Sequence, residues 1–369
     1  MDVKQSFSSQ GYFLGVYIIF FTLTSLYAQE KKILWKEFTS YYENGLLHER
    51  GQLISEKKSG TWITYSIQGK IQSLYNFTND VKSGQYAEWD VYGRLTREGQ
   101  FNNNEKCGIE YIYEEAQISM KITWLDFKSG KRKEESYDKN GFLRKVGFYK
   151  SSSKDSCWIY FAEDGKISAL ENYKNGQRNG EQKRYYPNNT IAEYAEYKNG
   201  LKHGRRLLVA ENGDTTLFGV YNNDERSGYF IEQTTLQVAD LSNDIKSYFV
   251  YGNYNNDFKE GTFLLFYSKN KKACSECYAK GTLNGRREIF YENGNLMFEC
   301  TYHDNKKTGR ENIYYPDGQL KKRSEYKNGF IDGEQIYFYE NGRISERAVF
   351  SAGKLKSFTR YKLQGKPVK

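Results

Sequence analysis

Histidine is almost absent from this chain, and its three copies, His48, His203 and His303, lie far apart in the sequence. His203 precedes a repeated glycine and His303 follows a repeated tyrosine, and both positions carry ordinary polar residues elsewhere. Without a histidine cluster, the sequence supports neither a Ser-His-Asp nor a Cys-His nucleophile. Carboxylates such as Glu292 and Asp317 recur at predicted turns, which favours solvated turn residues over a glycosidase pair. We therefore predict that the protein is not an enzyme.

Long apolar runs are missing as well, except for one stretch near the N-terminus, roughly Tyr12–Tyr27. A positive start at Lys4, an apolar run of this length and the small residue Ala28 are typical of a secretory signal peptide. We place cleavage after Ala28, although Leu26 at the −3 position is larger than the ideal, and an uncleaved anchor is the alternative. No cysteine follows the run, so a lipoprotein anchor is not expected. These residues predict an exported protein that is periplasmic, outer membrane-associated or secreted.

No helical period of comparable length follows the N-terminus, but a glycine returns every 24 residues. Such fixed self-similarity is the signature of a repeat array. The first glycines of the units form three runs, in each of which the step is 24: Gly60, Gly84, Gly108; Gly180, Gly204, Gly228; and Gly261, Gly285, Gly309, Gly333. A second glycine keeps the same step, as in Gly294, Gly318 and Gly342. The glycine-rich matches are therefore periodic, and we predict neither a phosphate-binding loop nor a cofactor.

Each unit divides into two short runs of residues around a turn such as Glu340-Asn341-Gly342. Aromatic and β-branched residues that flank Asn-Gly or Asp-Gly are a strong signal for a β-hairpin. Asn189 replaces the turn glycine in one unit, and asparagine also tolerates a positive φ. The chain therefore predicts an all-β fold, an elongated array of about fourteen 24-residue hairpin units in a twisted antiparallel sheet.

Aromatic residues form two columns at this spacing. One lies four places before the turn, as in Tyr314 and Phe338, and the other lies seven or eight places after it, as in Tyr326 and Phe350. The recurrent second aromatics of the units are candidate contact residues of a binding face, because strand alternation places them opposite their inner neighbours. The alternative is a solvent-facing cross-strand ladder that only stabilises the sheet. These candidates are Tyr186, Tyr267, Tyr291, Tyr315 and Tyr339.

The regular pattern of glycines is interrupted at two places. Around Gln117 and Arg132 the glycines are lost although the spacing holds, and the step from Gly228 to Gly261 is nine residues longer than the others. We place this insertion near residues 236–249 and expect a loop on one face, which is often the binding face of a repeat array.

The pattern resembles the MORN repeat in its bacterial variant form, Y-x-x-G, then a glycine, then Y-Y-x-N-G-x-hydrophobic. It appears as Tyr173, Gly176, Gly180 and Tyr185-Tyr186-Pro187-Asn188, and again as Tyr326, Gly329, Gly333 and Phe338-Tyr339-Glu340-Asn341-Gly342. The resemblance covers roughly residues 33–365. It implies a sheet of successive hairpins with a groove lined by aromatics, and protein, lipid or surface binding with no catalytic residues. Some bacterial members are antitoxin-type proteins, a cytosolic role that export disfavours.

The five cysteines are an odd number for an exported protein, which leaves at least one free or in an intermolecular bond. Cys107 and Cys157 are about two units apart, which places them on the order of 20 Å from each other, too far for a disulfide. Cys274 and Cys277 are a possible local disulfide. With Cys300 and His303 they have a zinc-like spacing, but Cys277 and Cys300 lie in successive units, so we predict no metal site.

The net charge of +9 is unchanged by removal of residues 1–28 and is spread over the array, residues 29–369. Because the charges are mixed and the aromatics follow the repeat, we expect no nucleic-acid partner.

Our first hypothesis is a non-enzymatic exported scaffold that binds a protein partner at the cell envelope. Glycan, peptidoglycan or anionic membrane-surface binding is the alternative. An enzyme would need a site in the insertion, where Asp240, Asp244 and Lys246 are better explained as a polar loop.

Overall fold

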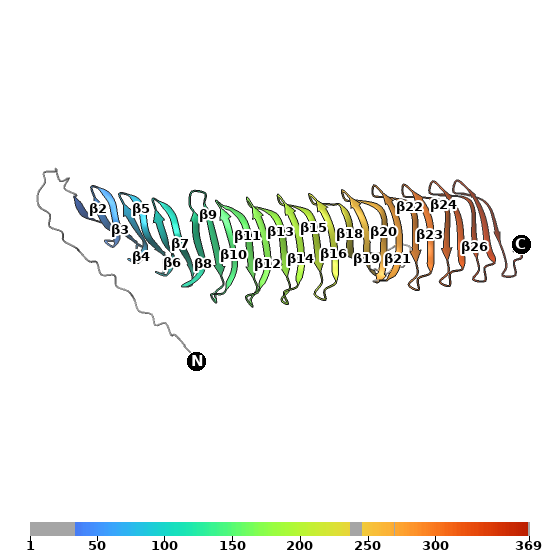
Figure 1. Ribbon diagram of the computed structural model, residues 1–369, viewed down its shortest axis with the longest axis horizontal. Coiled ribbons are helices and arrows are strands. Elements are labelled where there is room, and N and C mark those ends of the chain that lie inside the picture. The colour runs from blue at the N-terminus through green and yellow to red at the C-terminus, as the bar shows by residue number, and fades with distance from the viewer. Residues whose placement is uncertain (1–33, 237–245, 269, 368–369) are drawn as a thin grey trace, which may run out of the picture.

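The computed structural model describes residues 34–236, 246–268 and 270–367, and Figure 1 shows them as one row of strands that lie side by side in chain order. The predicted signal peptide, residues 1–28, falls outside the described residues. The strands are β1 (Trp35–Tyr41), β2 (Leu47–Ile54), β3 (Lys57–Tyr65), β4 (Ile71–Thr78), β5 (Val81–Trp89), β6 (Leu95–Asn102), β7 (Glu105–Glu114), β8 (Gln117–Asp126), β9 (Lys131–Tyr137), β10 (Leu143–Lys150), β11 (Ser153–Phe161), β12 (Ile167–Lys174), β13 (Gln177–Tyr185), β14 (Ile191–Lys198), β15 (Leu201–Val209), β16 (Thr215–Asn222), β17 (Glu225–Arg226), β18 (Gly228–Leu236), β19 (Lys246–Asn255), β20 (Phe258–Ser268), β21 (Lys271–Ala279), β22 (Thr282–Phe290), β23 (Leu296–His303), β24 (Lys306–Tyr314), β25 (Leu320–Lys327), β26 (Phe330–Phe338), β27 (Ile344–Ser351) and β28 (Lys354–Arg360).

All 28 strands belong to one antiparallel sheet, and the described residues contain no helix. Each strand pairs with the next one along the chain, as β13 pairs with β12 and β14; at one place β16 pairs with both short β17 and β18. The predicted all-β array of hairpins is therefore confirmed. Within the described ranges, no helical segment has the length and hydropathy of a membrane span.

Two kinds of turn alternate along the sheet. The wide turns occupy five residues, such as Tyr186–Thr190, in which the Tyr186 N–H donates to the Thr190 carbonyl over 2.9 Å. Gly318 and Asn189 take φ of +91° and +65° at the same place in their turns, which confirms the conformational reason for the turn glycine. The tight turns at the opposite edge have two residues, such as Asn199-Gly200 with φ of +50° and +86°, as type I′ hairpin turns require.

The glycine chosen from the sequence to open a unit lies inside a strand, except for Gly228, which begins β18. Gly180 has a φ of +96° and sits where the pairing of β12 with β13 shifts register, between Glu171↔Gln182 and Tyr173↔Arg178. This is a β-bulge, which bends a strand and increases its twist. Ser156 occupies the same position in its own unit with a φ of +57°.

One face of the sheet carries nearly all of the buried side chains. The residue two places after each bulge faces inward, and Trp158 and Phe263 are both fully buried there. A single-layer sheet can bury such rings only if it curls over them, and the repeated bulges supply that bend. The second aromatic column lies on the same face, because Tyr149 packs edge-on against Trp158 with ring centroids 5.0 Å apart. The buried residues at this inward-facing position of their units are Trp62, Tyr86, Glu110, Glu134, Trp158, Gln182, Phe230, Phe263, Glu311 and Gln335.

The insertion lengthens a hairpin instead of forming only a loop. Strands β18 and β19 pair continuously from Gly228↔Tyr254 to Leu236↔Lys246, whereas the ordinary hairpin of β15 and β16 pairs from Gly204 only to Val209. The insertion therefore extends the strand pairing, and residues 237–245 lie outside the described residues. Residues 246–249 of the predicted insertion belong to β19.

Candidate functional site

The five tyrosines proposed from the sequence share one arrangement. Each is half-buried, and its hydroxyl donates to a backbone carbonyl of the next unit. Four of them begin a wide turn, whereas Tyr267 lies near the end of β20, which pairs with β21 out to Ser268↔Lys271. Tyr315 Oη lies 2.9 Å from the Phe338 carbonyl oxygen, and Tyr291 Oη lies 2.8 Å from that of Tyr314. Tyr186, Tyr267 and Tyr339 bond in the same way to Val209, Phe290 and Tyr361.

These tyrosines therefore connect successive turns, and the alternative of a stabilising ladder describes their contacts better than a free binding face does. The ladder runs between repeats and not across paired strands, because donor and acceptor are 22 or 23 residues apart. Tyr42 makes the same bond to the Tyr65 carbonyl over 2.7 Å, although we did not select it from the sequence. The position of Tyr42 at the start of the first wide turn is the sequence feature from which it could have been predicted.

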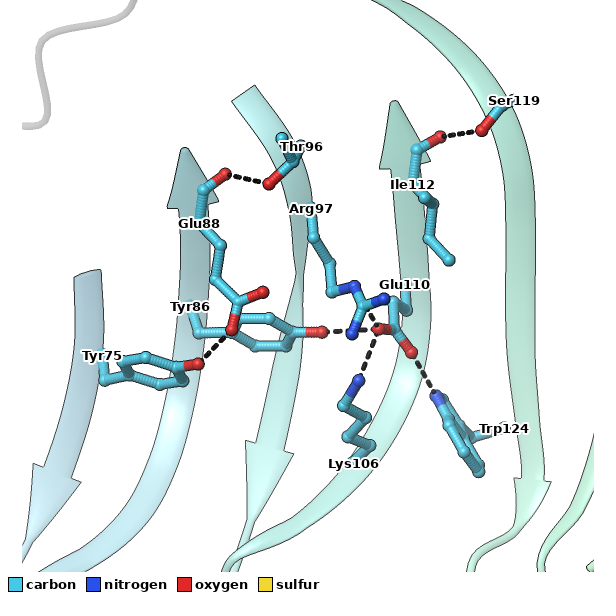
Figure 2. A network of polar contacts seen from close by, with 10 residues as sticks. All are labelled: Tyr75, Tyr86, Glu88, Thr96, Arg97, Lys106, Glu110, Ile112, Ser119 and Trp124. Atoms are coloured by element: carbon cyan, nitrogen blue, oxygen red, sulfur yellow. Dashed lines mark hydrogen bonds and ion pairs between the residues drawn. The ribbon is translucent and has the colours of Figure 1, made fainter. Parts of the chain in front are cut away.

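A buried carboxylate, that of Glu110 on β7, is the centre of the polar network in Figure 2. It accepts hydrogen bonds from Tyr86 Oη at 2.8 Å and Lys106 Nζ at 2.6 Å. It also accepts one from Trp124 Nε1 at 3.3 Å, and Arg97 Nε lies 3.4 Å away. Burial and the bond to Glu110 raise the pKa of the Tyr86 phenol, so it stays protonated and acts as a donor.

Glu311 on β24 repeats this arrangement near the other end of the sheet, with its carboxylate buried against Lys307 and with Lys322 Nζ at 3.2 Å. In both places the donors surround the carboxylate from neighbouring strands. Such an arrangement neutralises cations inside the curled sheet and leaves neither carboxylate open to a substrate. We assign both networks to stability.

Basic side chains cover the aromatic rings on the same face. Lys58 Nζ lies 3.9 Å from the centre of the Trp62 ring, and Lys154 Nζ lies 4.4 Å from that of Trp158. The ammonium group of Lys154 is partly withdrawn from solvent, and this burial lowers its pKa. Lys58 is also paired with Glu49 at 2.6 Å.

A pocket of about 590 Å³, here called the notch, lies at the wide-turn edge. It arises where the sequence loses its turn glycine. Gln117 stands at the glycine position and pairs with Glu114, and the hairpin closes through the tight turn Glu115-Ala116, with φ of +49° and +66°. The wide turns take a positive φ at the place that Gln117 occupies, whereas in this hairpin Glu115 and Ala116 take the positive φ instead.

The tight turn shifts the pairing by one residue. Glu110 pairs with Ile122, and the change is absorbed by a four-residue turn, residues 127–130, before β9. This explains why the 24-residue spacing survives around Arg132 although both glycines are lost. The notch lies between the wide turns of the two flanking units. It is lined by Asp90, Arg94, Leu95, Thr96, Tyr113, Glu114, Glu115, Ala116, Gln117, Ile118, Ser119, Tyr137, Asp138 and Lys139.

The carboxylates of the notch fall into two groups. Asp90 and Asp138 organise their own turns, since Asp90 Oδ1 accepts from the Tyr92 and Arg94 N–H groups at 2.9 Å. These hydrogen bonds hold the pKa of Asp90 below its usual value. Glu114 and Glu115, by contrast, are exposed and take part in no ion pair among the described residues.

The cysteines do not form the arrangement proposed from the sequence. Cys274 and Cys277 are both free. They are three residues apart on β21, and Cys274 is buried while Cys277 lies on the opposite face near the Thr262 hydroxyl. Strand alternation therefore does not support the predicted disulfide. Among the described residues, no group of three or more metal-ligating side chains could hold an ion.

Five segments of the chain match the model of the MORN repeat variant, residues 154–175, 178–199, 283–304, 307–328 and 331–352. Each matched segment runs from a strand start through a wide turn to the next tight turn, so these segments are MORN-variant repeats. No curated protein matches the chain.

Solved structures also match the chain, among them two crystal structures. The crystal structure of TcdB2-TccC3-TEV shares 10% sequence identity over 88% of this chain and 22% of that chain, with a TM-score of 0.15. The crystal structure of TcdB2-TccC3 without its hypervariable C-terminal region shares 10% identity over 90% of this chain and 23% of that chain, with a TM-score of 0.17. This chain thus spans less than a quarter of those chains, and the TM-scores are too low to bear on its function.

Proposed function

We propose that this array of MORN-variant repeats is a non-enzymatic scaffold that is exported and binds a protein partner at the cell envelope. The notch carries the proposal, because it is the place where a regular row of turns opens into a pocket of about 590 Å³. Pockets of this size commonly hold a ligand or an anchoring side chain.

The rest of the array suits a scaffold. Each repeat contacts its neighbours, so the array extends in one direction and presents sites at fixed spacings. Turn-to-turn hydrogen bonds hold those spacings at both edges, as from Tyr315 to Phe338 at the wide turns and from the Gly200 N–H to the Arg178 carbonyl at the tight turns. A rigid surface loses little entropy when it binds.

Affinity purification tests partner binding. The full chain is used as bait in the envelope fraction of the producing cells, and the recovered proteins are quantified by mass spectrometry. The proposal expects one protein in near-stoichiometric amount, and recovery of background proteins alone would exclude a stable partner.

Export rests on the apolar stretch Tyr12–Tyr27 and the small residue Ala28. N-terminal sequencing of the protein from periplasm and medium should give Gln29 as the first residue. Ile19→Arg, which interrupts the apolar stretch, should keep the protein in the cytoplasm. An unchanged distribution of this variant would show that the stretch does not direct export.

Glycan binding is the second candidate, and a patch beside the long hairpin favours it. Tyr229, Tyr251 and Phe266 line a shallow pocket of about 370 Å³ together with Thr262 and Asn253. Aromatic faces beside amide and hydroxyl groups suit the apolar faces and hydroxyls of sugars. Soluble peptidoglycan fragments should bind the full chain and bind Tyr251→Ala more weakly, with exposed Tyr41→Ala as the control. Equal binding by both variants would remove this candidate.

A further inference from the structure

We propose that the notch receives a turn of the protein partner, and that this turn carries a lysine or arginine beside an apolar side chain. The proposal rests on the proposed scaffold function and adds where the partner docks and which chemistry it presents.

The shape of the notch comes from a narrow hairpin between two wide turns. Asp90–Arg94 and Asp138–Phe142 fold as wide turns, while Glu115-Ala116 closes the hairpin between them with two residues. The flanking turns form the two walls, and β7 and β8 form the floor. The space between the two walls, above the narrow hairpin, has the width and the shape of a turn, so a projecting turn of another protein would fill it.

The interruption also leaves the turn-to-turn ladder incomplete. Lys70 Nζ donates to the Tyr92 carbonyl over 3.1 Å on one side, and Arg144 donates to the Ala162 carbonyl over 2.5 Å on the other. Within the described residues, no hydrogen bond joins the tight turn Glu115-Ala116 to the turn Asp138–Phe142.

The charge of the notch is the reverse of that of the chain. Arg94 pairs with Asp90 at 2.8 Å and Arg144 pairs with Asp138 at 2.5 Å, so these four groups cancel. The exposed pair Glu114 and Glu115 then outweighs Lys139, which leaves the notch acidic on a chain of net charge +9. Charge complementarity selects a cationic residue on the partner.

The turns that form the walls expose apolar side chains. Val91 and Tyr92 are 62% and 71% exposed on one wall, and Phe142 is 59% exposed on the other. Ile118, in the lining itself, is 38% exposed. Aromatic and aliphatic groups around a pocket are typical of an anchoring site, which is why the partner turn needs an apolar residue beside its cation.

Defined peptides test this inference directly, because they display the chemistry expected of the partner turn. The probes are three fluorescent cyclic hairpin peptides whose turns display Leu-Arg, Leu-Glu or Ala-Arg, titrated with the full chain and followed by anisotropy. We expect the Leu-Arg peptide to bind at least tenfold more tightly than either of the others, and added salt should weaken its binding. Equal affinity for the Leu-Arg and Leu-Glu peptides, or no binding of the Leu-Arg peptide, would contradict the proposal.

Two variants locate the binding. Glu114→Asp with Ala116→Asn and Gln117→Gly restores the turn signature of Asp138–Gly141 and should close the notch. Glu114→Gln with Glu115→Gln keeps the tight turn and removes its charge. Each should weaken binding of the Leu-Arg peptide at least tenfold, whereas Glu211→Gln in an ordinary wide turn should leave it unchanged. Full binding by both notch variants would overturn the assignment even if one of them folded poorly.

The outcome separates this inference from the scaffold function. If the full chain recovers a partner and the turn-restoring variant recovers the same amount, the scaffold function stands and the notch assignment fails. If the full chain recovers no partner, the scaffold function itself fails. If light scattering shows a dimer that the turn-restoring variant abolishes, the occupant is a second copy of this chain, which contradicts the proposed partner.

Discussion

The ring of Trp158 lies directly over Gly147, so that a Cβ at Gly147 would lie 2.1 Å from Trp158 Cδ2. Trp158 is fully buried. The same relation holds elsewhere, because a Cβ at Gly219 would meet the ring of Phe230 at 2.1 Å and one at Gly252 would meet that of Phe263 at 2.4 Å. In these three units the large ring is thus matched by a glycine on the preceding strand.

Gly147→Ala should destabilise the array, because the new methyl group has no room beneath a buried ring. We expect a loss of about 1–3 kcal/mol, the usual cost of overpacking a core. Urea unfolding followed by circular dichroism measures it. In a double-mutant cycle, Trp158→Ala should remove most of the penalty, and strictly additive effects would show that the two residues do not compete for the same space.

Tyr315→Phe tests the ladder of turn tyrosines. The substitution removes the hydroxyl that donates to the Phe338 carbonyl over 2.9 Å and leaves the ring in place. The midpoint of urea unfolding should fall by the equivalent of about 1 kcal/mol. Tyr41→Phe is the control, since Tyr41 is 63% exposed. Equal effects of the two variants would show that the ladder contributes nothing specific.

Glu110→Gln tests the buried network of Figure 2. The neutral amide would leave Lys106 and Arg97 without their carboxylate and would turn a donor group toward other donors. Breaking such a pair costs about 3–5 kcal/mol. Thermal unfolding should show a clear fall in the midpoint, whereas exposed Glu105→Gln should change little. A midpoint like that of the parent chain would mean that the network is dispensable.

The cysteines should differ in reactivity. Burial raises the pKa of Cys274 to about 12 and that of Cys300 to about 11, so both remain protonated and inaccessible at pH 8. Iodoacetamide should label half-buried Cys277 in the native protein and label Cys274 and Cys300 only after unfolding, as read by peptide mass spectrometry. A Cys274–Cys277 disulfide would instead leave both unlabelled until reduction, and that result would contradict the structure.

The hairpin fold could be predicted from the sequence because turn glycines report a local backbone requirement. Gly318 and Asn189 need a positive φ whatever surrounds them, and their 24-residue period carries that requirement along the chain. The bulge at Gly180 was less visible, because a positive φ inside a strand has the same sequence signature as one at a turn. Only the register of β12 against β13 distinguishes the two.

The site was harder to predict because its contacts join distant residues. The hydroxyl of Tyr315 meets a backbone carbonyl 23 residues away, and a carbonyl acceptor leaves no mark on the sequence. The position of Gly147 against Trp158 is partly visible in the sequence, because Gly51, Gly99 and Gly147 are spaced by two 24-residue units. The sequence pattern alone did not distinguish these glycines from the turn glycines. The loss of glycine at Gln117 was visible, whereas the pairing of Glu114 with Gln117 around a tight turn is seen only in the register of β7 against β8.

Photo-crosslinking in the producing cells tests the central claim most directly. A photoreactive amino acid replaces Ala116, which lines the notch, or Asn212, which lies in an ordinary wide turn. The account predicts one crosslinked protein from position 116 and none from position 212, with the crosslink on a partner turn that contains a lysine or arginine. No crosslink from position 116, or the same products from both positions, would contradict it.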